Sequence, residues 1–503
     1  MLILPFILLL LSTICNCHSI FESNQQLFDS NMIEDEQPQP SARKVFETHF
    51  ASRYGERWHS GLRLLLQHQP RTAALYNRYA PLQDFHRVMD TADPPDIERV
   101  RFPSAEGDIQ ADNLLCFTRQ YGENQDDKIV LEPQRASNGL MTHANLDAAS
   151  VLAIHMLQVV PGDNVLDVDA RWGKNSNVLA QSIWPSLYPD STLPPMMGAK
   201  KGILHSVGLL TSSNRELQKT MTQHLPASVV TSEQWRIARV NVTYRGAKDL
   251  PLGPGGYDKV LVNPRSSDER GIVHSIVGAK ARARVRAPSP LSLHSSGPSP
   301  TPSPSNSPSG HPSGHPSDQP TDHPTSQPTS QPTAQPTAHP TTHPISRPTD
   351  DPNEQPPGSP PGPPSPSPSG SSSSSTRGIN WDRLVKWTPS SHMARAEEQL
   401  QLLMTALHGV RVGGRVVYTT GSISEEENDG IVEKALSLIE KEAKDGNLSW
   451  TIELEILGDE VERQLTAEWA ERTVKGWIVL PDHVSYGEWG PRYFSVLTKK
   501  SKK

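Results

Sequence analysis

Cysteine is almost absent from this 503-residue sequence. Two of its three cysteines, Cys15 and Cys17, lie in the first nineteen residues, and Cys116 stands alone. Thiols distributed in this way exclude a disulfide framework and a cysteine-based zinc cluster. We therefore predict no metal site from the sequence.

Long apolar segments and an excess of positive charge are also missing. The apolar run in residues 1–19, "MLILPFILLLLSTICNCHS", is too short to span a bilayer comfortably and lacks preceding basic residues. We interpret it as a cleaved secretory leader that leaves no stable membrane span, or else as an incorrect start. Residues 20–40 form an acidic spacer, and the net charge of −7 gives no general attraction for phosphate.

Proline, in contrast, is abundant, with 47 residues concentrated in one tract. From Pro312 to Pro352 a proline recurs at every fourth position. Such a tract cannot bury enough apolar surface to offset its ordering entropy, so we predict a disordered, partly polyproline-II insertion at residues 279–377. The remaining residues suffice for a core of two domains.

Strand and helix patterns alternate in the rest of the chain. The spacing predicts strands at 164–168, 202–210, 236–244, 257–263 and 413–422, with helices at 146–157, 176–184, 215–225 and 396–410 between them. This order predicts an α/β fold with a mostly parallel, doubly wound sheet. Ligands of such sheets bind at the carboxyl ends of the strands, which here are residues 167–174, Gly208, Tyr244, 263–267 and 420–422.

Three segments, "GDNVLDVDARWGK", "YDKVLVNPRSSDER" and "GVRVGGRVVYTTGSISEEEN", together resemble the Nop/Sun family of S-adenosylmethionine-dependent RNA cytosine-C5 methyltransferases. "FETHFASRYGERWHSGLRLLL" and "MTHANLDAASVLAIHML" resemble the mitochondrial ribosomal-RNA member. The resemblance implies a Rossmann-like methyltransferase sheet in residues 161–278 and 378–503, ending in an antiparallel hairpin. It also implies a mainly helical RNA-positioning region at 41–160, ribosomal RNA as partner and a mitochondrial location, against the secretory alternative from the leader.

The family's chemistry needs two thiols, and both are missing here. One thiolate adds to carbon 6 of cytosine so that carbon 5 can attack the methyl group, and a second cysteine assists product release. The resemblance assigns these positions to Gly421 and Arg265. Ser266 is a poor substitute, because an alcohol ionises far less than a thiol and no general base adjoins it in the sequence. We therefore expect impaired catalysis.

The resemblance also implies the cofactor contacts, and several of these are altered. The glycine-rich loop is one residue shorter and contains Trp172 where small residues are expected. Gly208 lies where a carboxylate would hold the ribose, and Tyr244 where an aspartate would read the adenine. The remaining candidates for S-adenosylmethionine are Asp167, Ala170, Gly173, Lys174 and Asn263. Asp167 could equally be a strand-end carboxylate that caps the next helix.

Other interpretations stay open. Asn263 with the following proline is half of the Asn-Pro-Pro-aromatic element of amino-methyltransferases, although a type I turn explains it equally well. The basic runs 280–286 and 499–503 are either solvated or contact phosphate, and Tyr54 and Trp58 either position RNA or belong to the core. The whole chain could be a non-catalytic RNA-binding or ribosome-assembly factor with a protein partner, or the product of an incorrect exon assignment whose true exons encode the cysteines.

Overall fold

The computed structural model describes ten stretches of the chain. They are residues 42–68, 70–91, 97–105, 114–119, 132–193, 201–238, 246–274, 276, 388–483 and 485–502. The predictions for the leader, the acidic spacer, the Pro-rich insertion, the basic run 280–286 and Tyr244 therefore lie outside the described residues.

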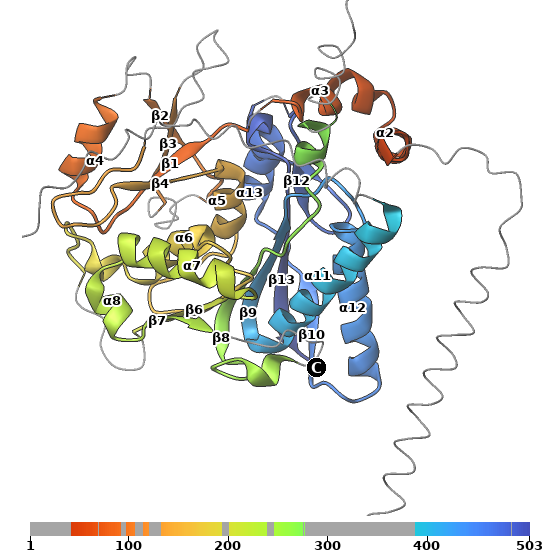
Figure 1. Ribbon diagram of the computed structural model, residues 1–503. Coiled ribbons are helices and arrows are strands. Elements are labelled where there is room, and N and C mark those ends of the chain that lie inside the picture. Colours follow the sequence, from red (N-terminus) through yellow and green to blue (C-terminus); the bar gives the residue numbers. More distant parts are fainter. Residues whose placement is uncertain are drawn as a thin grey trace, which may run out of the picture. The chain divides into compact units, whose positions relative to one another are not determined.

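A nine-stranded sheet organises these residues (Figure 1). Its order is β11-β12-β13-β9-β8-β5-β6-β7, and β10 pairs with β13. The strands are β5 Asn164–Val168, β6 Ile203–Val207, β7 Trp235–Ala238, β8 Tyr257–Val262, β9 Val410–Thr420, β10 Trp450–Leu454, β11 Glu471–Arg472, β12 Trp477–Val479 and β13 Arg492–Ser501. Strands β5 to β9 run parallel, and β12 with β13 forms the expected antiparallel hairpin. The predicted α/β fold class is confirmed.

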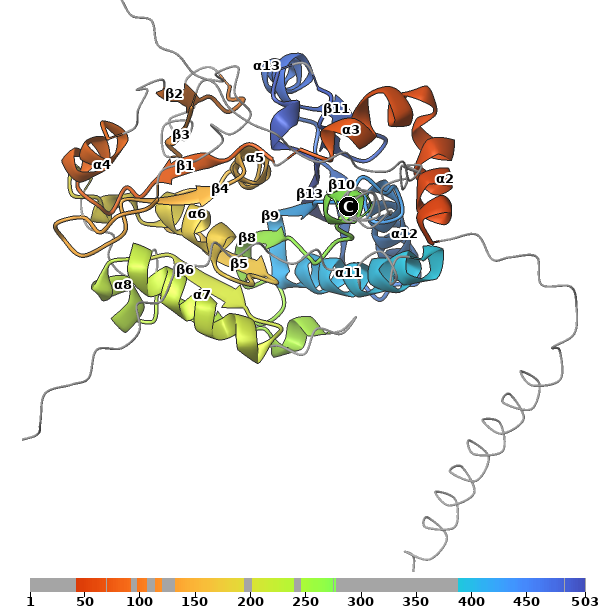
Figure 2. The same cartoon turned by 45° about the horizontal axis from the view of Figure 1, so that its top comes forward.

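Helices cover both faces of this sheet (Figure 2). They are α5 Ala148–His155, α6 Lys174–Ile183, η4 Pro185–Leu187, α7 Thr211–His224, α8 Ala227–Thr231, η6 Gly246–Asp249, α11 Pro389–Gly409, α12 Asp429–Lys444, α13 Asp459–Gln464, η7 Leu465–Trp469 and η8 Gly487–Trp489. Successive strand residues face opposite sides, so Leu261 packs with α5, α6 and α7, whereas Val260 and Val262 pack with α11 and α12. Burial on both faces explains why these strands read as continuous apolar runs.

The helix starts follow local sequence signals. Thr388 caps α11 through a reciprocal pair of hydrogen bonds with Ser391. Asp147 caps α5, where its carboxylate accepts from the Ser150 backbone N–H at 2.6 Å. The expected apolar stripe of α11, which includes Leu403 and Leu407, is fully buried.

The amino-terminal region contains a sheet that the sequence analysis did not predict. Its four strands pair antiparallel in the order β2-β3-β1-β4. They are β1 Ala73–Tyr76, β2 Ile97–Val100, β3 Cys116–Arg119 and β4 His143–Leu146, alongside helices α2 Ala42–Tyr54, η1 Trp58–Leu62, α3 Arg63–Leu65 and α4 Leu82–Met89. Helices still hold more of the described residues of this region than strands do, so the predicted region contains an additional sheet beside its helices. Each strand has four residues, too few for an alternation of apolar and polar positions to stand out.

Tyr54 and Trp58 pack within the protein rather than forming an exposed RNA surface. Trp58 is fully buried against Phe50 in the core shared with α11 and α12. The hydroxyl of Tyr54 donates to the carbonyl of Ile423 at 2.7 Å, just beyond β9. The amino-terminal helix α2 thus supports a loop at the carboxyl edge of the large sheet.

The carboxy-terminal lysines correct another prediction. Lys499 and Lys500 belong to β13, and Lys499 is 4% exposed. Its ammonium donates to the carbonyls of Leu407 and Val410 at 2.9 and 2.8 Å, at the end of α11. Lys502 donates to a carbonyl near the end of α12. Residues 499–502 therefore include helix-capping cations and are not simply a solvated tail.

Candidate active site

The carboxyl ends of the parallel strands border an open pocket of about 640 Å³. Because β5, β8 and β9 run parallel, the loops that follow them emerge at one edge of the sheet. Residues from all three loops and from α11 line the pocket, among them Arg171, Trp172, Arg265, Ser266, Arg395 and Gly421. The structure therefore brings the predicted catalytic loops together.

Ser266 and Gly421 face each other directly. The backbone N–H of Gly421 donates to the Ser266 hydroxyl at 3.2 Å. A Cβ atom added to Gly421 would lie 3.5 Å from that oxygen, which is an ordinary van der Waals contact. Arg265 is exposed, and its carbonyl accepts from the Gln399 side chain at 2.9 Å. The side chain that reaches Gly421 is thus that of Ser266, whereas Arg265 forms part of the pocket rim.

The loop after β5 has a constrained backbone. Asp169, Arg171 and Gly173 have φ angles of 60°, 48° and 82°. A Cβ on Gly173 would lie 2.9 Å from the end of the Leu217 side chain, so another residue here would displace Leu217 and strain the left-handed backbone. Gly173 is the residue that precedes α6, and Trp172 is 60% exposed at the pocket rather than packed inside.

Asp167 is tied to the helix that follows it. The Ser176 hydroxyl, in the first turn of α6, donates to the fully buried Asp167 carboxyl at 2.6 Å. Burial raises the pKa of Asp167 to about 7. Asp167 thus contacts α6 through the Ser176 side chain rather than by capping its backbone, and it does not line the 640 Å³ pocket.

The other proposed cofactor residues are distributed around this edge. Ala170 is buried and its N–H donates to the carbonyl of Val207 at 3.0 Å, whereas Lys174 is exposed. Asn263 is 6% exposed, and its side-chain oxygen accepts from Arg492 at 3.4 Å. Asn263 therefore does not line the pocket as a free amide, which the amino-methyltransferase interpretation requires.

Gly208 leaves no room for a side chain. A Cβ at this position would lie 1.7 Å from the side-chain oxygen of Asn214, a residue in the first turn of α7. An acidic residue at 208 would therefore require Asn214 to move. The sequence analysis missed Asn214, because its place above Gly208 depends on how α7 begins.

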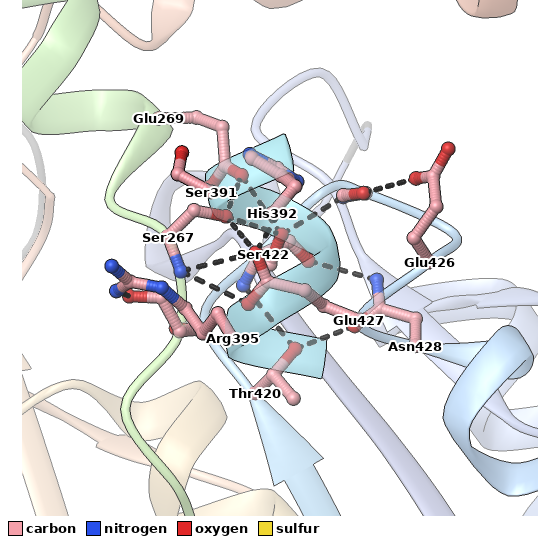
Figure 3. A network of polar contacts seen from close by, with 12 residues as sticks. Ser267, Glu269, Ser391, His392, Arg395, Thr420, Ser422, Glu426, Glu427 and Asn428 are labelled. Carbon is pink, nitrogen blue, oxygen red and sulfur yellow. Dashed lines mark hydrogen bonds and ion pairs between the residues drawn. The ribbon is translucent and has the colours of Figure 1, made fainter. Parts of the chain in front are cut away.

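A buried polar network beneath the pocket was also missed (Figure 3). Ser267 lies at its centre, and its hydroxyl contacts carboxyl oxygens of both Glu269 and Glu427. The Ser422 hydroxyl donates to Glu269 at 2.8 Å, and the Gln399 side chain donates to Glu427 at 2.7 Å. These contacts join the loop after β8, the loop after β9 and α11.

Both glutamates are fully buried, as is nearly all of His392. Burial and the neighbouring Glu427 charge raise the pKa of Glu269 to about 8, and burial raises that of Glu427. Burial lowers the pKa of His392 to about 4. One sequence signal was available, since Glu269 and Glu427 each lie seven residues beyond the end of adjacent parallel strands.

Known proteins with similar sequences are RNA methyltransferases. The chain is 26% identical over 248 residues to 5-cytosine rRNA methyltransferase NSUN4 of Bos taurus, covering 46% of this chain and 58% of that protein. It is 23% identical over 277 residues to the mitochondrial tRNA (cytosine(34)-C(5))-methyltransferase of Danio rerio, covering 54% of this chain and 68% of that protein. The matched region thus spans about three fifths of the bovine relative. The resemblance to the Nop/Sun family is confirmed.

Two further comparisons concern the fold and the insertion. The crystal structure of NSun6 from Pyrococcus horikoshii with SFG aligns with a TM-score of 0.46 at 11% identity, covering 92% of this chain and 98% of that one. The family model for the PT disordered repeat matches residues 312–354. Within the described part of the chain, no helix combines the length and the apolar character that crossing a bilayer requires.

Proposed function

We propose that this chain is an S-adenosylmethionine-dependent RNA methyltransferase-family protein, directed by descent at cytosine C5 of ribosomal RNA and impaired in catalysis. The observation that carries the proposal is the contact between Ser266 and Gly421 at the pocket. The two loops that hold the family's thiols meet there, and neither has a cysteine. The single cysteine of the described residues, Cys116, is buried in the amino-terminal sheet.

Activation of cytosine requires a nucleophile at carbon 6, and Ser266 is not equipped for this role. The N–H of Gly421 donates to its hydroxyl, which stabilises the oxygen but removes no proton from it. The buried carboxyls nearby contact Ser267 instead. We therefore propose that the described residues at this pocket include no group able to activate the base by covalent addition.

The cofactor, S-adenosylmethionine, would supply an electrophilic methyl group. The residues of the expected cofactor pocket fit this molecule in part. The left-handed Gly173 before α6 keeps the helix amino end open to a carboxylate. Gly208 and Asn214 do not fit the usual ribose contact, since no carboxylate is present and the Asn214 side chain fills the space. We propose weakened cofactor binding at Ala170, Gly173, Lys174 and the neighbouring loop.

Methyl transfer and cofactor binding can be tested separately. Calorimetric titration with S-adenosylmethionine should give no saturable binding at micromolar concentrations. Incubation with labelled cofactor and an unmodified small-subunit ribosomal RNA transcript should give no labelled RNA. Tight cofactor binding would contradict the weakened pocket, and labelled product that survives Ser266→Ala would show a chemistry that needs neither thiol nor this hydroxyl.

A second candidate function is non-catalytic RNA binding, and the pocket rim favours it. Arg171, Arg265 and Arg395 line the same pocket as the exposed Trp172. Guanidinium groups contact phosphates, and an exposed indole offers a face for stacking a base. In this case the protein would act in ribosome assembly with RNA and a protein partner. A mitochondrial location, as printed in the name of the Danio rerio relative, suits either function.

RNA binding at this pocket predicts that removing the exposed indole lowers the affinity for RNA. Trp172→Ala should weaken binding of a fluorescent single-stranded RNA by about 5- to 150-fold, because stacking on an aromatic contributes about 1–3 kcal/mol per base. Ile456→Ala is the surface control, since Ile456 is an uncharged side chain that is 86% exposed and does not line the pocket. Equal affinity of the Trp172→Ala protein and the parent would exclude this face as the RNA platform. Imaging of the tagged full chain decides between mitochondrial and secretory localisation.

A further inference from the structure

Three side chains beneath the catalytic loops form a compact set of potential metal ligands. Glu269, His392 and Glu427 each offer a ligand atom, and these atoms all lie within 4.8 Å of one another. We call these residues the Glu-His-Glu cluster. They come from the loop after β8, the amino end of α11 and the loop after β9, and they converge on one point (Figure 3).

The hydrogen bonds of the cluster do not balance the negative charges of its two carboxylates. The Ser267 hydroxyl contacts a carboxyl oxygen of Glu269 and another of Glu427. A hydroxyl has one proton and can donate to one of the two carboxylates at a time. Two ionised, fully buried carboxylates therefore need either a proton between them or a bound cation.

A buried carboxyl oxygen of Glu269 also indicates a bound cation. Among the described residues, Oε2 of the fully buried Glu269 has no hydrogen-bond partner. The Glu269 side chain extends toward His392 and Ser422 in Figure 3. A buried carboxyl oxygen without a partner is costly, and coordination of a metal ion would satisfy it.

The separation of one pair of ligand atoms is that of a small tetrahedral transition-metal site, and the third atom lies within 4.8 Å of both. Nδ1 of His392 lies 3.4 Å from Oε1 of Glu427. A tetrahedral ion with bonds of about 2.0–2.1 Å requires its ligands to lie roughly 3.3 Å apart. Imidazole nitrogen is a poor ligand for the hard cations Mg²⁺ and Ca²⁺ and a common one for Zn²⁺.

We propose that Glu269, His392 and Glu427 bind a divalent transition-metal ion, Zn²⁺ first of all, which ties both catalytic loops to α11. The sequence analysis predicted no metal because it considered cysteine patterns, and this cluster contains none. The ion is a structural element under the pocket. It holds in place the backbone that presents Ser266 and Gly421, independently of whether methyl transfer occurs.

The test compares Zn²⁺ binding by the full-length chain and its variants, which are stripped of metal with EDTA, reloaded with Zn²⁺ and then dialysed to remove loosely held ion. Elemental analysis should find one equivalent of tightly held Zn²⁺ more in the parent than in the near-isosteric Glu269→Gln and in Glu269→Gln/His392→Gln. The difference is the informative quantity, because histidines outside the cluster, such as His311 and His315 in the Pro-rich tract, are potential Zn²⁺ ligands too. His408→Gln, which alters a His–Glu pair with no second carboxylate, should retain the full equivalent.

Two further readouts keep the proposal falsifiable if the variants unfold. Co²⁺ added to the parent protein should give the visible absorption of a tetrahedral site with nitrogen and oxygen ligands. Zn²⁺ should raise the melting temperature of the parent by several degrees and leave that of folded Glu269→Gln unchanged. The same tight Zn²⁺ stoichiometry in parent and folded cluster variants, or no tetrahedral Co²⁺ spectrum, would overturn the proposal and leave the two glutamates sharing a proton.

Discussion

Placing cysteines at positions 266 and 421, the two positions that contact each other at the pocket, tests whether missing thiols alone stop methyl transfer. A Cβ on Gly421 would meet its nearest heavy atom, the Ser266 hydroxyl, at 3.5 Å. Gly421 also has no left-handed backbone angle that would disfavour a side chain. The double variant Ser266→Cys/Gly421→Cys therefore fits the existing backbone and places two thiols at the same side of the pocket.

The double substitution should change the free energy of unfolding little and restore a nucleophile for methyl transfer. Sulfur is a weak acceptor, so losing the Gly421 N–H to Ser266 hydrogen bond costs about 0.5–1.5 kcal/mol. Replacing glycine offsets about 0.4–1 kcal/mol of this through the unfolded chain. A thiol of pKa about 8.5 is roughly 3% ionised at pH 7, and a nucleophile of this kind should give labelled RNA where the parent protein gives none.

The assay follows labelled methyl transfer to unmodified small-subunit ribosomal RNA at saturating cofactor, with reducing agent to keep the neighbouring thiols apart. Gly421→Cys alone should trap a covalent protein–RNA adduct on a denaturing gel, because the thiol that assists release is missing. Arg265→Cys/Gly421→Cys is the matched control for the alternative position of the second cysteine, and we expect it to be less active. A folded double variant that binds cofactor and RNA yet transfers no methyl group would refute the reasoning.

Three further predictions concern stability. Gly173→Ala should destabilise the protein in urea unfolding by about 1 kcal/mol more than Gly446→Ala, because both have left-handed φ angles but the Cβ at 446 meets nothing within 4 Å. Asp167→Asn should become more stable than the parent as the pH rises from 4 to 8. The pKa of Asp167 is about 7 in the folded protein against an ordinary value of 3.8, so ionisation lowers the free energy of unfolding of the parent by about 4 kcal/mol above pH 7 and not at low pH. Equal pH profiles of the two proteins in urea unfolding would contradict this. Lys499→Met should lower stability by about 1–3 kcal/mol, because it leaves buried carbonyls without their donor, whereas the exposed Lys500→Met should be near neutral.

The large sheet could be predicted from the sequence because its strands carry strong local signals. Apolar runs such as 257–262 are bounded by turns and alternate with helical stripes, and the order of these elements implies a parallel sheet. The four-residue strands β1 to β4 carry no such signal. Their pairing joins segments far apart in the chain, such as Leu75 with Cys116 and with Ala144, so that only the tertiary fold defines them.

The candidate site, like the fold, could be predicted from the sequence only in part. The approach of the loops after β8 and β9 follows from the parallel order of the strands, so a meeting of residues near 265 and 421 could be expected. It could not be predicted that Ser266 is the side chain in contact with Gly421, because this depends on the path of the loop after Asn263. Lys499 shows the same limit, since a lysine-rich carboxy-terminal run typically indicates solvated residues, whereas here the ammonium is buried by the end of α11.

If the proposed function is right, the absence of both thiols leaves the architecture of the site intact for a physical reason. The two catalytic loops are joined by Ser267, Glu269, Ser422 and Glu427, none of which takes part in covalent addition to a base. Substitution at 265 or 421 is therefore expected to leave these side-chain contacts between the loops in place. Gly421 and Arg265 accordingly occur in loops that meet at the pocket, where the Gly421 N–H donates to the Ser266 hydroxyl.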